Sequence, residues 1–170
     1  MTKGYVFKKR LLKLANELSV QPTKRFYFGS WAGSDWAGDP FLSCGTTCCA
    51  MGLATTIPSF RRLGLRMYRL PINNIPWVGL IGDDTLESSQ NASRVIFGTS
   101  NEEFKFLFLP YGDMICVNEI ADQKNKFGRN SPHKHATAKE VAANIRYFVK
   151  RKYAKHPKAM LREPLAHGNK

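Results

Sequence analysis

The densest group of residues that could do chemistry is the string Ser43-Cys44-Gly45-Thr46-Thr47-Cys48-Cys49. A thiol at the start of a helix is activated, because the helix dipole and the unpaired backbone N–H groups stabilise its thiolate. We place a helix start at Cys44, which makes this thiol the candidate nucleophile, with His133 or His135 as its base. Cysteine before histidine is the order in papain-like hydrolases, although the local sequence matches none of their signatures. One hypothesis is therefore a cysteine-dependent hydrolase or transferase.

The same cysteines allow two other interpretations. Cys44 and Cys48 are four residues apart on the expected helix and could bind a metal together with Cys116 and His135. Structural zinc sites usually contain two close ligand pairs, and only one such pair exists here, so we predict no metal site and no cofactor. The interpretation that we favour is that the cysteines pack as small apolar residues beside neighbouring glycine and alanine.

Positive charge is the second feature, and it is concentrated at the two ends of the chain. The net charge is +13, with +6 in residues 1–25, −4 in residues 26–123 and +11 in residues 124–170. Basic ends around a mildly acidic middle suggest an anionic partner, most often nucleic acid. An acidic protein surface and a face that is merely solvated are the alternatives.

The C-terminal helix has the clearest start signal and carries most of the candidate phosphate contacts. Thr137-Ala138-Lys139-Glu140 is a capping box, in which a hydroxyl is followed three residues later by Glu. Tyr147 and Tyr153 could stack on exposed bases, and phosphate contacts of this kind do not depend on nucleotide sequence. The cations expected to contact phosphate are Arg146, Lys150, Arg151, Lys152, Lys155 and Lys158.

The elements that must position these residues indicate a mainly α (α+β) fold. We expect a compact helical domain with a few short strands and a basic C-terminal helix and tail, residues 1–155 forming the domain and residues 156–170 a flexible tail. The apolar spacing and capping patterns predict helices over 5–20, 44–55 and 86–97, and helices that start at Ser100 and Thr137. A short helical turn follows Pro58, a strand spans 65–70, and residues 71–84 are expected to form a loop.

The two predicted helices on either side of Gly98 have the outline of a helix-turn-helix. Ala92, Val95 and Ile96 should point inward from the first of them. The second helix exposes Asn101, Glu102 and Glu103 near its start, and these acids would repel phosphate. We therefore interpret the pair as a hairpin of the core rather than as a DNA reader.

Composition excludes several classes of protein. No run of residues approaches the roughly 18 apolar residues that a membrane span needs. The first ten residues are basic but lack the apolar run and cleavage site of a secretory signal. Four cysteines, two of them adjacent, do not form a disulfide pattern in a chain of 170 residues. We expect reduced thiols and a cytoplasmic protein that does not associate with membranes.

The block from Cys44 to Ala54, followed by Ile57-Pro58, resembles a set of small uncharacterised proteins from bacteriophages and bacteria. These share a Cys-Gly-Thr-x-x-Cys-x-x-Gly core, and Phe97-Gly98-Thr99-Ser100 and the closing Thr137-x-x-Glu140 are similar to that group as well. The resemblance implies a compact helical fold and a phage origin, and it implies no activity. The additional adjacent cysteine and the long basic tail depart from the pattern.

Together these observations favour a non-enzymatic, phage-encoded basic module that binds nucleic acid or an assembly surface through residues 139–162. The cysteine-dependent enzyme built on Cys44 and His133 or His135 is one alternative. A structural subunit of a virion or of another complex is the other.

Overall fold

The described part of the chain is mostly helical, with one small antiparallel sheet. The computed structural model describes residues 3–22, 26, 49–69, 76–83, 88–109, 126–132 and 135–154. The elements are α1 (Lys3–Ser19), α2 (Ala50–Ala54), α3 (Pro58–Arg61), β1 (Leu65–Arg69), β2 (Pro76–Leu80), α4 (Ser88–Phe97), α5 (Asn101–Phe108) and α7 (Ala138–Lys152). The predicted fold class is therefore confirmed. None of the described helices is long and apolar enough to cross a membrane.

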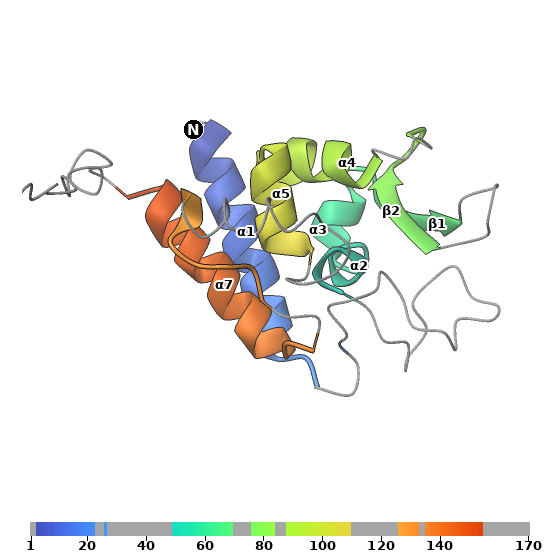
Figure 1. The fold of residues 1–170 in the computed structure, drawn as a ribbon. Helices are drawn as coiled ribbons and strands as arrows, with labels where there is room; N and C mark the ends of the chain where they lie inside the picture. The colour runs from blue at the N-terminus through green and yellow to red at the C-terminus, as the bar shows by residue number, and fades with distance from the viewer. Residues whose placement is uncertain are drawn as a thin grey trace, which may run out of the picture.

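The first and last described helices, α1 and α7, lie side by side and run in opposite directions (Figure 1). In the middle of α7, Arg146 reaches Ser19 at the end of α1, with 2.8 Å between Nη2 and Oγ. At the end of α7, the ring of Tyr153 lies next to Gly4 at the start of α1. The two termini of the described chain therefore meet in one helix pair, at the opposite end of the molecule from the β1–β2 hairpin (Figure 1).

The core between these elements is rich in phenylalanine. Phe106 stacks on Phe127 with 4.4 Å between ring centroids, and Phe97 contacts Phe60 edge-on at 5.3 Å. All four rings are buried. Because aromatic pairs contribute stability beyond the area they bury, these contacts hold α3, α4, α5 and the segment 126–132 against one another.

Both predicted capping boxes are confirmed. The Ser100 side chain accepts a hydrogen bond from the Glu103 backbone and the Glu103 carboxylate accepts one from the Ser100 backbone. Thr137 and Glu140 do the same at the start of α7. Each box satisfies backbone N–H groups that the first turn of a helix leaves unpaired, which explains why these two starts could be located from sequence.

The β1–β2 hairpin corrects the prediction of a loop over residues 71–84. Antiparallel pairing joins Leu65 to Leu80 and Met67 to Val78. Proline is tolerated at the first position of a strand, so Pro76 begins β2 rather than excluding it. Gly79 allows the Tyr68 ring to lie directly against the strand, because a Cβ there would be 2.6 Å from the Tyr68 hydroxyl.

The prediction that Val95 points inward is wrong. Its side chain is 50% exposed, whereas Ala92 and Ile96, which are four residues apart on α4, are fully buried. The apolar stripe of this helix is narrow, and Val95 lies about 100° around the axis from Ile96. The remaining expectation for the pair holds, since α4 and α5 bury Phe97 and Phe108 against each other at 5.6 Å.

Candidate functional site

The helix expected from Cys44 begins later, and this changes the interpretation of the cysteine block. Cys49 has extended backbone dihedrals and is the N-cap residue of α2, which starts at Ala50. Its Sγ accepts a hydrogen bond from the backbone N–H of Gly52 at 3.5 Å. Side chains that accept such a bond favour the cap over the helix interior, so the helix does not extend back through Cys49.

Cys49 is a packed, unreactive thiol. It is 2% exposed, and burial raises its pKa to about 11. A thiol with a raised pKa carries almost no thiolate near neutral pH, so it is a poor nucleophile and a poor metal ligand. The favoured interpretation of the cysteines is thus confirmed at this one position. Cys44, Cys48 and Cys116 lie outside the described residues.

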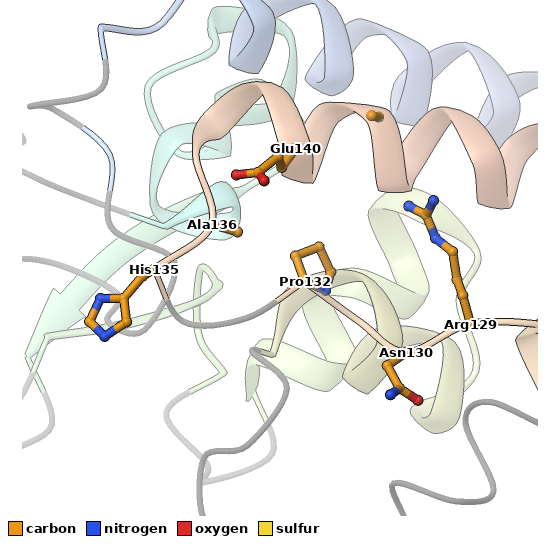
Figure 2. A pocket seen from close by; sticks show the side chains of 7 residues that line it. Arg129, Asn130, Pro132, His135, Ala136 and Glu140 are labelled. Atoms are coloured by element: carbon orange, nitrogen blue, oxygen red, sulfur yellow. The ribbon is translucent and has the colours of Figure 1, made fainter.

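His135 is the only member of the predicted Cys–His pairs that the structure describes. It is exposed at the rim of a cavity beside α7, and its ring points away from the other lining side chains (Figure 2). The nearby Glu140 carboxylate is bound to the backbone and hydroxyl of Thr137. His133 lies outside the described residues. In the described ranges no three His, Cys, Asp or Glu side chains form a group that could hold a metal ion.

Three of the predicted phosphate-contacting cations on α7 make contacts within the protein. Arg146 donates to the Ala15 carbonyl, to Asn16 and to Ser19, and so ties α7 to α1. Arg151 donates to the Tyr147 hydroxyl and to the Lys126 carbonyl at 3.4 Å each.

Lys152 is bound more tightly than either arginine. Its Nζ lies 2.6 Å from Glu103 Oε2 and 3.0 Å from the Gly98 carbonyl. The ammonium also lies over the Phe148 ring, 5.4 Å from its centroid. Because Glu103 offsets its charge, Lys152 stabilises the fold and is less available than an unpaired lysine to contact phosphate.

Lys150 differs from these three residues. It is exposed and makes no hydrogen bond, ion pair or ring contact with any described residue. It follows Arg146 by one helical turn, on the side of α7 that borders α1. Lys155 and Lys158 lie outside the described residues.

The structure adds the cations of α1, which the sequence-based site left out. Lys9 and Lys13 are exposed and one turn apart, on the side of α1 opposite the buried Leu11 and Leu14. Lys9 lies over the ring of Tyr5, with 4.6 Å between Nζ and the ring centroid. We call the exposed side of the helix pair the basic face, and its exposed cations are Lys9, Lys13, Lys139, Arg146 and Lys150. The signal in the sequence was the spacing of the α1 lysines, which places them on the outer side of that helix. They share a surface with the α7 cations only because α1 packs against α7.

Acidic side chains are nearly absent from the two helices that form the basic face. The only acid of α1 is Glu17, which is two turns from Arg10 and therefore lies on the same side of α1. Arg10 donates to the Ile96 carbonyl at 2.9 Å, so this side of α1 is turned toward α4. The only acid of α7 is Glu140, whose carboxylate is held in the capping box. Glu17 also follows Lys13 by one helical turn and so lies beside it, whereas Lys9 and Lys150 have no acid three or four residues away on their own helices.

The two tyrosines expected to stack on bases are engaged within the protein. Arg129 covers the ring of Tyr147 at 4.4 Å, and the Tyr147 hydroxyl donates to the Phe127 carbonyl at 2.8 Å. Tyr153 is only partly exposed and packs beside Gly4. The exposed aromatic residue of the basic face is Tyr5, 45% of which is accessible to solvent.

Comparison with known proteins adds no further assignment: no family model, no curated protein and no solved structure matches this chain.

Proposed function

We propose that this protein is a non-enzymatic module that binds nucleic acid through the basic face of α1 and α7. The observation that carries the proposal is the pairing of α1 with α7, the first and last described helices, which brings lysines from two distant segments onto one surface. Lys150 and Lys9 form no ion pair among the described residues, and neither has an acid three or four residues away on its own helix. Unpaired surface lysines gain by displacing the condensed counterions of a phosphate backbone.

The mode of binding follows from the side chains available. Arg146 is bound to α1 and Tyr147 is covered by Arg129, so the side chains that would read bases from α7 are occupied. Lysine ammonium groups contact phosphate as point charges and do not read base edges. The proposed binding is therefore independent of nucleotide sequence and sensitive to salt.

A charge-reversed variant tests the proposal. We expect Lys9→Glu combined with Lys150→Glu to weaken binding to a fluorescein-labelled DNA duplex of about 20 base pairs by at least tenfold at about 100 mM salt. Both side chains are exposed and make no ion pair among the described residues, so the fold should be retained. Fluorescence anisotropy gives the dissociation constants, and circular dichroism checks the fold.

The matched control is Arg61→Glu combined with Arg62→Glu. These two exposed arginines lie on or next to α3, away from the α1–α7 pair, and their reversal changes the net charge by the same amount (Figure 1). Equal loss of affinity in both double variants would show that net charge alone controls binding and would reject the basic face. If the parent protein binds an acidic protein probe and does not bind DNA, nucleic acid is rejected as the partner and an acidic protein surface takes its place.

A further inference from the structure

A cavity of about 470 Å³ lies on the other side of α7 from α1. Its lining residues are Arg129, Asn130, Pro132, His135, Ala136, Glu140 and Ala143 (Figure 2). The volume falls in the range of about 300–1,000 Å³ that is usual for small-molecule sites. The lining combines an apolar part, contributed by Pro132 and the two alanines, with two charged side chains of opposite sign.

Arg129 is held rigidly at one end of this cavity. Its Nε and Nη2 both donate to Asn144 Oδ1, at 2.9 Å and 2.5 Å, and its guanidinium lies over the Tyr147 ring. Asn144 is itself fully buried and donates to the Phe106 carbonyl at 3.2 Å. Arg129 has no carboxylate partner among the described residues, and its Nη1 makes no hydrogen bond there. A partly buried guanidinium in this state has donors ready for an anion.

Glu140 provides the opposite charge at the other end. Its Oε2 accepts hydrogen bonds from Thr137 N and Oγ1 at 2.7 Å and 2.8 Å, while Oε1 has no partner among the described residues. The hydrogen bond from the Thr137 backbone lowers the pKa of this carboxyl, so it is ionised at neutral pH. The capping box thus holds the carboxylate at the first turn of α7, where it does not pair with Arg129.

The two charged groups are attached to α7 one helical turn apart, Glu140 directly and Arg129 through Asn144. Glu140 and Asn144, which binds Arg129, are four residues apart and so lie about 6 Å apart along α7. Figure 2 shows the Arg129 guanidinium and the Glu140 carboxylate on opposite sides of Pro132, both next to α7. A simple anion would be attracted by one and repelled by the other, whereas a zwitterion satisfies both.

We propose that this cavity binds a small zwitterion of the α-amino-acid class with an apolar side chain. The ligand carboxylate would contact Arg129, the ligand ammonium would contact Glu140, and the side chain would lie on Pro132, Ala136 and Ala143. The proposed ligand uses none of the lysines of the basic face, although Ala143 lies one helical turn from Lys139 and Arg146.

The test uses three probes that differ only in their charged groups: L-leucine, 4-methylpentanoate, which lacks the amine, and 3-methylbutylamine, which lacks the carboxylate. Binding is followed by chemical-shift changes of the Ala143 amide and of the Arg129 Nε–H in isotope-labelled protein. We expect saturable shifts with L-leucine and at least tenfold weaker binding of each single-charge probe. Equal binding of 4-methylpentanoate, or no saturable shift with L-leucine, would overturn the proposal.

Two variants assign the site. Arg129→Met should remove the leucine-induced shifts, and Glu140→Gln should weaken binding at least tenfold. Arg129→Met leaves Asn144 Oδ1 without the two donors of Arg129 and so could destabilise the protein. Glu140→Gln avoids this problem, because Gln retains the capping box and the fold should be kept. Unchanged leucine binding in Glu140→Gln would reject the role assigned to the carboxylate.

Discussion

Lys152 at the end of α7 donates to Glu103 at the start of α5, with 2.6 Å between Nζ and Oε2. The same carboxylate oxygen accepts the Ser100 backbone N–H at 2.8 Å and so completes the capping box of α5. One acid therefore starts one helix and anchors the end of another. The basic stretch at residues 150–152 therefore contains both a structural contact, Lys152, and an unpaired surface charge, Lys150.

Lys152→Met is expected to lower stability more than affinity for DNA. The ion pair is partly exposed, so its loss should cost about 0.5–1 kcal/mol of the free energy of unfolding, and the Phe148 contact is retained in part by the methionine. Urea denaturation measures the change, with Lys150→Met as the control that should leave stability unaltered. A larger effect of Lys152→Met than of Lys150→Met on DNA affinity would contradict the assignment.

Gly98→Ala should destabilise the protein by about 2 kcal/mol or more. Gly98 has a φ of +66°, and an added Cβ would overlap the ring of Phe7 on α1. Gly82→Ala is the matched control, because Gly82 has a φ of +82° but nothing within 4 Å of the added Cβ. That control should cost only the backbone term of about 1–2 kcal/mol. Urea denaturation measures both changes. Equal losses of unfolding free energy in the two variants would show that overlap with Phe7 does not contribute to the effect of Gly98→Ala.

Asn144→Ala should cost about 2–3 kcal/mol of the free energy of unfolding, because it leaves the Phe106 carbonyl and two Arg129 donors without their partner. Asn144 is fully buried, so water cannot replace it. The exposed neighbour Ala143, changed to Ser, serves as the control with little expected effect. A loss below about 0.5 kcal/mol for Asn144→Ala would mean that this polar contact is not a determinant of the fold.

The buried Cys49 thiol should make the free energy of unfolding depend on pH above neutrality. Its folded pKa of about 11 is higher than the value of 9.0 expected without burial, so the folded state retains the proton that the unfolded state releases. The stability from this group is fully present below pH 9.0 and is lost as the pH rises toward 11, by at most about 2–3 kcal/mol.

Cys49→Ser removes the ionisable group and keeps a side chain that can accept the Gly52 N–H. The difference in unfolding free energy between the parent and Cys49→Ser should therefore change between pH 9 and 11 and be constant below pH 8. A pH-independent difference across the whole range would show that the thiol is not buried as described.

Local signals in the sequence predicted the two helix starts that carry capping boxes, at Ser100 and Thr137, but not the start of α2. Thr137 and Glu140 are three residues apart, so their capping box is visible without knowing the fold. The strand at Pro76 was missed because its evidence is the partner strand and the Tyr68 ring that fills the space above Gly79.

The same limit applies to the candidate site. The sequence predicts that Lys150 is on a basic helix. It does not predict that Lys152 pairs with Glu103, or that Lys9 of α1 joins the same face, because both depend on contacts between segments far apart in the chain. Arg129 and Glu140 are eleven positions apart, and this spacing does not predict that they line one cavity.

The central claim is that lysines of α1 and α7 form one phosphate-binding face, and the salt dependence of DNA affinity tests it most directly. The slope of log K against log salt concentration should fall in magnitude by about 2 for Lys9→Glu with Lys150→Glu, since each phosphate contact contributes about 0.9 to the slope. Arg61→Glu with Arg62→Glu should leave the slope as in the parent. Slopes that are the same in all three proteins would contradict the basic face.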